Sequence, residues 1–280
     1  MIGNFFKQST SNQAKIINGK YIANSIIQEC KLKIEKLTLN TGLKPGLAII
    51  QIGDRQDSNI YIKNKLKTAQ SIELNKDSSI NGIITQLPLE NFNKFDYTDL
   101  TNQVLPEKDV DCLNIINLNK IFNGDLKGNF IPCAAKATAE ILDLIERDLR
   151  DKQVVIVGSS KLVGIPLKYI LEYKNAKNVL LCNDKTQNIQ DICRKADILI
   201  VAIGCSRFIN GNYVKSGAIV IDVGINFNKM TNKVTGDVNF EEVVQKASYI
   251  TPVPGGVGPI TVSILMENVY MAALKSLNKK

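Results

Sequence analysis

The sequence has no histidine in its 280 residues. This absence excludes Ser-His-Asp and Cys-His catalysis, HExxH zinc sites and every histidine general base. Proton transfer near neutral pH must therefore come from Lys, Asp, Glu, Tyr, Cys or water.

Paired cysteines are also absent. The six cysteines are scattered without a CxxC pair: Cys30, Cys112, Cys133, Cys182, Cys193 and Cys205. This pattern argues against a zinc site and against a disulfide framework, and we expect no bound metal. It predicts a reducing compartment.

Long apolar runs are missing as well. No run reaches the length that a membrane-spanning helix needs, so we expect no membrane partner. Residues 1–13 are polar, carry one cation and no acid, and lack the apolar core of a secretory signal. A weak mitochondrial leader and a frayed terminus both remain open. We expect an intracellular protein, with the cytoplasm favoured and the mitochondrial matrix as the alternative.

The net charge is +8, and the Lys and Arg residues are spread along the chain. A spread excess is more typical of a solvated surface than of a nucleic-acid stripe, so we expect no nucleic-acid partner. It would attract an anionic ligand such as a polyglutamate tail or a pyrophosphate.

Short apolar runs alternate with helical stretches, which predicts a parallel α/β protein. The runs are rich in Val and Ile without strict alternation, as in strands buried on both faces. The expected strands are Leu47–Ile52, Gly82–Gln86, Val154–Gly158, Asn178–Cys182, Ile198–Ile203 and Ala218–Val223. The expected helices are Tyr21–Lys36, Ser58–Ser71, Lys136–Arg147, Val163–Tyr173, Glu241–Lys246 and Ile260–Leu277. We expect a Rossmann-like dinucleotide-binding domain at 137–259 and an α/β catalytic domain at 15–136, to which the C-terminal helix 260–280 returns.

The segment from Gln153 to Gly164 predicts a strand, a tight turn and the start of a helix. Gly158 would let the backbone turn sharply, and Ser160 could cap the helix or meet a phosphate oxygen. Gly164 would allow the helix to approach the sheet closely, and the helix N-terminus would offer N–H groups to a pyrophosphate. The GxSxxxG pattern is weaker than GxGxxG, so an ordinary βα turn stays open.

The next expected strand ends at Cys182, followed by Asn183 and Asp184. An acidic side chain there can accept hydrogen bonds from the ribose hydroxyls of the adenosine and would repel a 2′-phosphate. The alternative is a solvated loop residue.

In the first domain, Tyr61 and Lys65 are four residues apart on an expected helix and share one face. A Tyr ring beside an ammonium can stack on a flat ligand and lower the pKa of the amine; such pairs are otherwise common surface features. Gln86 interrupts an apolar strand at its C-terminal end, where α/β sites lie, although it could simply cap the strand.

Two carboxylates, Asp109 and Asp111, lie near an expected loop, and a buried Asp could grip an aminopyrimidine edge through paired hydrogen bonds. Solvated charges in a turn are the alternative. The segment Thr251–Thr261 is the most unusual, because three prolines and three glycines precede an apolar helix. They predict either a backbone platform beside a ligand or a rigid linker.

Together these segments resemble the bifunctional methylenetetrahydrofolate dehydrogenase/cyclohydrolase family, from about Ile16 to Leu274. The stretch TPVPGGVGPIT is highly specific for that family. PEKDVD, GIITQLPL and SNIYIKNKLK each match a family segment in the expected order.

The resemblance implies roles for individual residues. Lys65 would be the general acid/base of the cyclohydrolase step, Tyr61 would pack on the folate, Gln86 would hold and tune Lys65, and Asp111 would bind the pterin. The implied substrate-binding residues are Tyr61, Ile62, Lys63, Asn64, Lys65, Thr85, Gln86, Leu87, Asp111, Pro252, Val253, Pro254, Gly255, Gly256, Val257, Gly258, Pro259 and Ile260. The implied cofactor-binding residues are Gly158, Ser159, Ser160, Gly164, Asp184 and Ile225.

The implied activity is oxidation of 5,10-methylenetetrahydrofolate to the 5,10-methenyl form with NAD(P), followed by hydrolysis to 10-formyltetrahydrofolate. Hydride loss leaves a cation stabilised by two nitrogens, so this step needs positioning rather than a base, in keeping with the missing histidine. Asp184 favours NAD over NADP, although NADP stays open because Lys161 and Lys185 are near in sequence. The expected partners are tetrahydrofolate derivatives and a second copy of the chain, because the family usually forms homodimers through its nucleotide domains.

The chain departs from the family pattern in several places. The family's PCTPxG is here the segment 132–137, PCAAKA, and the Gly expected after Asp111 is Cys112. The expected N-x-G-R is Asn117-Leu-Asn119-Lys120, and the expected His is Asn183.

The largest departure is a missing strand and helix, on the order of two dozen residues, between Lys65 and Gln86. In a sheet of order 2-1-3 the missing strand is at the edge, so its loss need not separate strands one and three. The helix with Lys65 could nevertheless move to the other face of the sheet. Three alternatives to the bifunctional enzyme stay open: a dehydrogenase without cyclohydrolase activity, a catalytically impaired or truncated folate-fold protein, and a Rossmann dehydrogenase of another substrate. The missing unit and the PCAAKA segment favour the impaired or truncated protein among these alternatives.

Overall fold

The computed structural model describes residues 5–7, 13–51, 76–86, 97–228 and 233–277. The chain forms two compact units. The sheet unit contains Met1–Ile26 and Cys133–Ser263, and the strand-pair unit contains Ile27–Pro132 and Ile264–Lys280. The domain boundaries expected from the sequence differ from these units mainly at residues 15–26, which belong to the sheet unit.

The sheet unit is built on a seven-stranded sheet of order β1-β2-β11-β8-β7-β5-β6. Its strands are β1 (Phe6–Lys7), β2 (Lys15–Ile17), β5 (Gln153–Val157), β6 (Asn178–Cys182), β7 (Ile198–Val201), β8 (Ile219–Asp222) and β11 (Tyr249–Ile250). All neighbours are parallel except β1 and β2. From β5 onward the order is 2-1-3-4-5, so the chain reverses direction across the sheet between β5 and β7.

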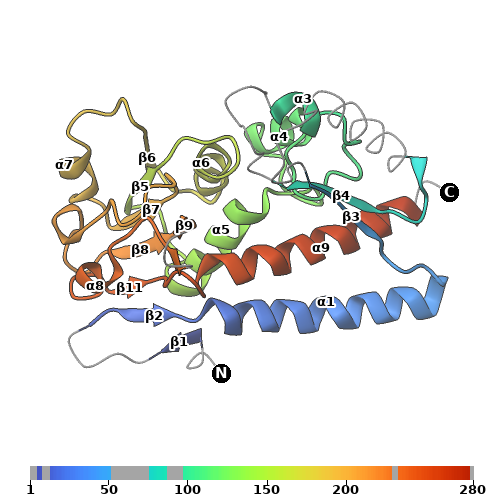
Figure 1. Ribbon diagram of the computed structural model, residues 1–280, viewed down its shortest axis with the longest axis horizontal. Helices are drawn as coiled ribbons and strands as arrows, with labels where there is room; N and C mark the ends of the chain where they lie inside the picture. Colours follow the sequence, from blue (N-terminus) through green and yellow to red (C-terminus); the bar gives the residue numbers. More distant parts are fainter. Residues whose placement is uncertain (1–4, 8–12, 52–75, 87–96, 229–232, 278–280) are drawn as a thin grey trace. The chain divides into compact units, whose positions relative to one another are not determined.

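Helices cover both faces of this sheet: α5 (Cys133–Ile145), α6 (Gly164–Tyr173), α7 (Ile189–Cys193) and α8 (Phe240–Val243). Figure 1 shows α6 on one side of the strands and α7 and α8 on the other. Every residue of β7 and β8 is buried, as the continuous Val/Ile runs predicted. Parallel strands carry such runs because water reaches neither of their faces.

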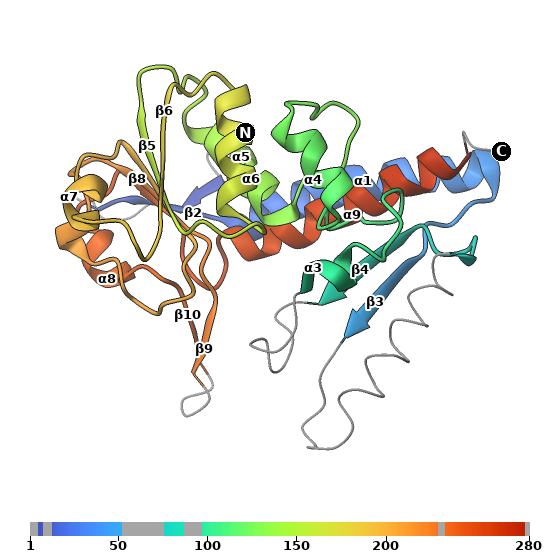
Figure 2. The ribbon, with the colours of Figure 1, turned by 90° about the horizontal axis from the view of Figure 1, so that it is seen from above.

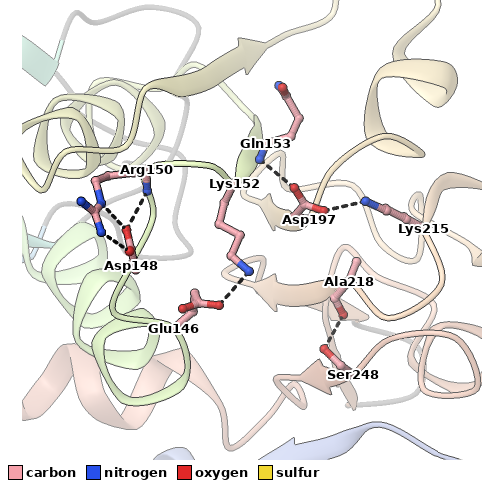
Figure 3. Close-up of polar contacts among 9 residues, drawn as sticks. All are labelled: Glu146, Asp148, Arg150, Lys152, Gln153, Asp197, Lys215, Ala218 and Ser248. Atoms are coloured by element: carbon pink, nitrogen blue, oxygen red, sulfur yellow. Dashed lines mark hydrogen bonds and ion pairs between the residues drawn. The ribbon is translucent and has the colours of Figure 1, made fainter.

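Side-chain contacts fix the amino ends of the strands (Figure 3). The Asp197 carboxylate accepts hydrogen bonds from the backbone N–H of Gln153 at 2.9 Å and from the Lys215 ammonium at 2.6 Å. The Ser248 hydroxyl donates to the carbonyl of Ala218 at 3.3 Å. These contacts connect the starts of β5, β7, β8 and β11 at the end of the sheet that is remote from the expected ligand site.

A short antiparallel ribbon follows β8. It consists of β9 (Asn226–Asn228) and β10 (Lys233–Thr235), whose three residue pairs include Val234 opposite Phe227. Figure 2 shows the ribbon standing apart from the strands of the large sheet. A 3₁₀ turn, η3 (Gly211–Tyr213), lies between β7 and β8. Neither the ribbon nor the turn was predicted from the sequence.

The strand-pair unit contains two parallel strands, β3 (Leu47–Gln51) and β4 (Gly82–Gln86), paired from Leu47–Gly82 to Gln51–Gln86. They lie side by side in Figure 2. The expectation that strands one and three stay together without the missing edge strand is therefore confirmed. The predicted helix Ser58–Ser71 lies outside the described residues.

The helices of the strand-pair unit are α3 (Tyr97–Thr101), α4 (Ile115–Phe122) and the later parts of α1 (Gly19–Thr41) and α9 (Val257–Leu277). Helix α4 begins where the Asn114 side chain accepts a hydrogen bond from the N–H of Ile116 at 2.8 Å. Asn268 on α9 donates to the carbonyl of Val110 at 2.8 Å, which holds the loop before α4 against this helix.

Helix α9 is, among the described residues, the one helix long and apolar enough to cross a membrane by length and composition. The predicted helix Ile260–Leu277 was three residues shorter than α9. The 18-residue window that meets the criterion is 44% buried within the structure. The core helix of a soluble protein passes the same test, so the helix is weak evidence for a membrane.

One buried hydroxyl in this unit has no partner. Thr85 on β4 is 4% exposed, and within the described part of the chain its Oγ1 makes no hydrogen bond. Burying a hydroxyl without a partner costs about 1–3 kcal/mol. The resemblance implied substrate binding by Thr85, which stays a prediction, and its side chain is buried in the structure.

We therefore expect Thr85→Val to raise the free energy of unfolding by about 1 kcal/mol, because valine has nearly the same shape and no hydroxyl to desolvate. Thermal and urea unfolding would measure this change. Thr101→Val is the matched control and should destabilise, since the buried Thr101 hydroxyl donates to the carbonyl of Thr98 at 3.2 Å. A loss of stability in Thr85→Val would show that its hydroxyl is paired in solution.

Candidate functional site

The turn after β5 lies at the point where the strand order reverses. Gly158 has a φ of +119°, and a Cβ on it would overlap the carbonyl oxygen of Ala202, the residue after β7. The Gly158 N–H donates to the carbonyl of Cys182 at 2.8 Å, and the Ala202 N–H donates to the carbonyl of Val157 at 2.8 Å. The turn therefore sits directly between the carboxyl ends of β6 and β7.

Helix α6 starts in contact with this turn. A Cβ on Gly164, its first residue, would overlap the carbonyl oxygen of Gly158. The Ser160 hydroxyl accepts a hydrogen bond from the Val163 N–H at 3.2 Å, and the Ser160 carbonyl accepts one from the Ile165 N–H at 3.0 Å. The structure thus shows the sharp turn and the close helix approach predicted from the glycines. An α/β protein binds phosphate groups at such a helix start.

Asp184 lies at the exposed tip of the turn that follows β6. The Asn183 side chain accepts a hydrogen bond from the Lys185 N–H at 3.0 Å, and the Asn183 N–H donates to the Thr186 hydroxyl at 2.9 Å. Asn183, where the family pattern has His, thus closes the turn that presents Asp184. The Asp184 carboxylate faces solvent at the same sheet edge as Gly158, since β5 and β6 are parallel and in register from Gln153–Asn178 to Val157–Cys182.

Asp222, the last residue of β8, is 3% exposed and was not predicted as a site residue. Its Oδ1 accepts hydrogen bonds from the N–H groups of Gly224 at 2.9 Å and Asp237 at 3.1 Å, and its Oδ2 accepts one from Val238 at 2.9 Å. Burial raises the pKa of Asp222 to about 6, and the neighbouring Asp237 carboxylate raises it too, while the three N–H donors oppose the rise.

Asp237 is fully buried and connects three segments. Its Oδ2 accepts hydrogen bonds from the N–H groups of Ile203 at 2.7 Å and Gly204 at 2.9 Å, and its Oδ1 accepts one from the Asn226 side chain at 2.8 Å. Ile225, an expected cofactor residue, lies next to Asn226 and is 67% exposed.

The sequence carried one signal for Asp222 as a site residue. Asp222 interrupts an apolar strand at its carboxyl end, which is the pattern that singled out Gln86.

The Thr251–Thr261 segment forms an irregular backbone in the sheet unit before α9. The Thr251 hydroxyl accepts a hydrogen bond from the Asp222 N–H at 2.7 Å, the Val253–Pro254 peptide is cis, and Gly255 has a φ of +109°. A Cβ on Gly19 would overlap the carbonyl oxygen of Gly256.

Not all residues of this segment are accessible at the surface. Gly256, Val257 and Ile260 are buried, whereas Pro252, Val253, Gly255, Gly258 and Pro259 are half-buried and Pro254 is exposed. The expectation that all nine residues from Pro252 to Ile260 line a ligand site therefore stays a prediction. The three buried residues are the least accessible to a ligand. Helix α9 begins at Val257, three residues before the predicted start, so Gly258 and Pro259 belong to its first turn.

In the strand-pair unit the buried carboxylate is Asp109 rather than Asp111. Asp109 is 3% exposed and accepts hydrogen bonds from the N–H groups of Leu113 and Asn114, both at 3.0 Å, and from the Asn117 side chain at 2.9 Å. Burial raises its pKa to about 6 against these three donors. Asp111, the expected pterin residue, is half-buried.

The loop of Asp109 lies beside β4. Asp109 bridges Ile83 in parallel, and the Ile83 N–H donates to the carbonyl of Lys108 at 2.7 Å. The Asp109–Asp111 loop therefore runs alongside the strand that ends at Thr85 and Gln86. Of Gln86 only the backbone is described. Tyr61, Ile62, Lys63, Asn64, Lys65 and Leu87 lie outside the described residues.

Cys112 takes the place of a family glycine and has a φ of +58°, a conformation that favours glycine. Its buried thiol donates to the carbonyl of Phe130 at 3.3 Å. Burial raises the pKa of this thiol, so it stays protonated. Within the described ranges, no three His, Cys, Asp or Glu side chains are grouped so that they could hold a metal ion.

Comparison with known proteins identifies two family domains. Residues 132–277 match the model of the tetrahydrofolate dehydrogenase/cyclohydrolase NAD(P)-binding domain, and residues 17–74 match the catalytic domain of the same family. The bifunctional protein FolD of Thermodesulfovibrio yellowstonii is 41% identical to this chain over an alignment of 283 residues. The alignment covers 93% of this chain and 96% of that protein.

The cytoplasmic C-1-tetrahydrofolate synthase of Rattus norvegicus is 40% identical over 295 residues and 95% of this chain. Here the chain spans only 31% of the length of the relative. The alignment is longer than the aligned part of this chain, so it contains positions that the chain lacks, as the missing strand and helix predict.

Two solved structures extend the likeness to the fold. The bifunctional FolD of Campylobacter jejuni has a TM-score of 0.82 and 36% identity, covering 93% of this chain and 98% of that one. The methylenetetrahydrofolate dehydrogenase-cyclohydrolase of Trypanosoma brucei, solved with NADP cofactor and an inhibitor, has a TM-score of 0.83 and 31% identity, covering 95% and 99%. The chain belongs to the tetrahydrofolate dehydrogenase/cyclohydrolase family.

Proposed function

We propose that this chain oxidises 5,10-methylenetetrahydrofolate to 5,10-methenyltetrahydrofolate with a nicotinamide dinucleotide, and then hydrolyses the product to 10-formyltetrahydrofolate. The observation that carries the proposal is the glycine turn at the sheet reversal between β5 and β7, in a chain that matches both family domains. The relatives named as bifunctional enzymes support the second step.

The sheet unit offers the features that a dinucleotide needs. Gly158 leaves the turn without a side chain, α6 starts beside this turn, and Ser159 and Ser160 are accessible. A pyrophosphate would bind here, with Asp184 toward the ribose hydroxyls and Ile225 on the side of β8. The bound dinucleotide supplies a hydride acceptor, so the protein has only to hold the two reactants in place.

The hydrolytic step needs a proton carrier. Lys65 is our candidate because the family resemblance implies this role, and the chain has no histidine that could take its place. In this proposal Lys65 moves protons as water attacks the methenyl carbon, Gln86 holds Lys65, Tyr61 packs on the folate and Asp111 accepts hydrogen bonds from the pterin. The buried Asp109 supports this arrangement because it stabilises the loop on which Asp111 lies.

An impaired folate-fold protein and a dehydrogenase without cyclohydrolase activity are weaker proposals. The first was suggested by the missing strand and helix, yet β3 and β4 still pair over five residues. It was also suggested by PCAAKA, yet Cys133, Ala135 and Ala137 pack as buried residues of α5. Neither feature disrupts the described structure of its unit.

We further propose a homodimer formed through the sheet unit. β6 is the last strand of its sheet, so one edge of its backbone is open to another strand in the described structure. Leu180 on β6 and Tyr169 and Tyr173 on the adjacent α6 are exposed, although large apolar side chains favour burial. A second copy placed along β6 would cover them.

The names of the rat and bacterial relatives are consistent with an intracellular site of action, with the cytoplasm preferred to the mitochondrial matrix.

The role of Lys65 is tested by Lys65→Met. We expect this variant to lose hydrolysis of methenyltetrahydrofolate at least a hundredfold while still reducing the dinucleotide, because the hydride step needs no base. The two steps are followed separately, by the decay of methenyl absorbance and by the formation of reduced dinucleotide. Lys67→Met removes the same charge from the same segment and should change neither rate. Unchanged hydrolysis in Lys65→Met would remove Lys65 from the mechanism.

For the choice of cofactor we propose NAD, because Asp184 would face the 2′-phosphate of NADP; the Trypanosoma brucei relative, solved with NADP, makes NADP the competing assignment. Two like charges about 4 Å apart repel by about 1 kcal/mol in water and about 4 kcal/mol at an effective dielectric of 20. We expect Asp184→Ser to lower the KM for NADP at least fivefold and to leave the KM for NAD nearly unchanged.

Steady-state kinetics with both dinucleotides would measure this change. Asp191→Ser removes an exposed carboxylate from α7 in the same unit and controls for the change in net charge. A wild-type preference for NADP, or no gain in NADP use by Asp184→Ser, would show that Asp184 does not determine the choice.

A further inference from the structure

We infer that Asp237 is a positioning residue for the dinucleotide: its carboxylate holds the backbone after β7 against the glycine turn at which the cofactor binds. This inference rests on the proposed dinucleotide site. It concerns a residue with no place in the sequence motifs of that site, and it predicts that Asp237 determines cofactor affinity without touching the cofactor.

The first step of the argument is the contact with the end of β7. Two successive N–H groups, those of Ile203 and Gly204, donate to the same oxygen of Asp237, at 2.7 and 2.9 Å. Hydrogen bonds to a carboxylate are stronger than those between neutral groups. Two of them from adjacent peptides fix the direction of both peptide planes, so the chain leaves β7 along one path.

That path begins beside the glycine turn. Ala202 precedes Ile203, and its carbonyl oxygen occupies the space that a side chain on Gly158 would need. The Ala202 N–H also donates to the carbonyl of Val157 at 2.8 Å. A shift of the Ile203 and Gly204 peptides would therefore move the backbone that contacts the turn.

Several hydrogen bonds connect the loop 203–208, called here the β7 loop, with the segment 236–239 and the residues next to each of them. The Arg207 N–H donates to the carbonyl of Gly236 at 3.0 Å, and the Ile209 N–H, just after the loop, donates to that of Asp237 at 3.0 Å. The hydroxyls of Ser206 and Thr235 share a hydrogen bond of 2.7 Å. Asp237 supplies the carboxylate that accepts the N–H groups of the β7 loop at Ile203 and Gly204, where this loop leaves the sheet.

Asp237 is itself held by Asp222, whose two oxygens accept the N–H groups of Asp237 and Val238. Two glycines make room for the pair. A Cβ on Gly224 would overlap the Asp237 carboxylate, and a Cβ on Gly236 would overlap that of Asp222. Each aspartate thus fits against a glycine from the segment of the other.

Asp237 also reaches the segment after β8. Its second oxygen accepts a hydrogen bond from the Asn226 side chain at 2.8 Å, next to the exposed Ile225. One side chain therefore binds two segments beside the site, through backbone N–H groups after β7 and through the Asn226 side chain after β8. A role in stability alone would lower the unfolding temperature without changing dinucleotide affinity, so the two roles predict different effects of substitution.

The test is Asp237→Asn, with Asp197→Asn as the matched control. Asparagine keeps the size of the side chain, but in either orientation its NH₂ group faces an N–H donor. We expect the Kd for the dinucleotide to rise about tenfold or more, with the KM for folate and the kcat at saturating dinucleotide nearly unchanged. Asp197 likewise accepts a backbone N–H and a side-chain donor, but at the amino ends of the strands (Figure 3), so Asp197→Asn should leave the Kd unchanged.

Binding is measured by titration calorimetry with NAD and with NADP, alongside thermal unfolding of each variant. An unchanged Kd in Asp237→Asn would overturn the inference, and so would an equal rise in Kd in both variants. If Asp237→Asn does not fold, Asn226→Ala takes its place. It leaves Asp237 intact and removes one of its three donors, and it should raise the Kd about threefold; no rise would count against the inference. Failure of the wild-type chain to bind either dinucleotide would contradict the proposed function instead.

Discussion

The close approach of backbone to backbone at Gly158 is the constraint on which the sheet unit depends. The carbonyl of Ala202 and the start of α6 both occupy space that side chains at Gly158 and Gly164 would fill. Because neither residue has a Cβ, two strand ends and one helix start meet at a single point. The result is a turn beside a helix start at the reversal of the sheet, which is where α/β proteins bind dinucleotides.

Buried carboxylates hold the loops around that point. Asp222 and Asp237 each accept three hydrogen bonds from N–H donors, and none of these donors carries a full positive charge. For Asp222, burial disfavours the charged form, and its three donors offset that cost while the loops keep their positions. The pair therefore couples the geometry of the loops after β7 and β8. Asp109 does the same for its own loop in the strand-pair unit, with three donors of the same kind.

The sequence allowed the α/β class, six strands and the glycine turn to be predicted, because apolar runs and glycine spacing are local signals. Asp237 could not be found in this way, since Ile203 and Gly204 lie more than thirty residues before it. Its role depends on which loops the sheet order brings together. The same limit applies to the buried acid of the strand-pair unit. Nothing local in the sequence distinguishes Asp109 from Asp111, and it is Asp109 that bridges Ile83 on β4. The two-residue strands β1 and β11 carry no recognisable pattern and are defined by their neighbours.

The central claim is that one chain carries out both steps despite the missing strand and helix. The most direct measurement is a time course of the purified wild-type chain with 5,10-methylenetetrahydrofolate and NAD, following reduced dinucleotide and methenyl absorbance together. The account predicts that reduced dinucleotide accumulates while the methenyl signal rises only transiently and decays to 10-formyltetrahydrofolate. A methenyl product that accumulates without decay would contradict the hydrolytic step. Dinucleotide binding without any reduction, with NAD or with NADP, would contradict the account as a whole.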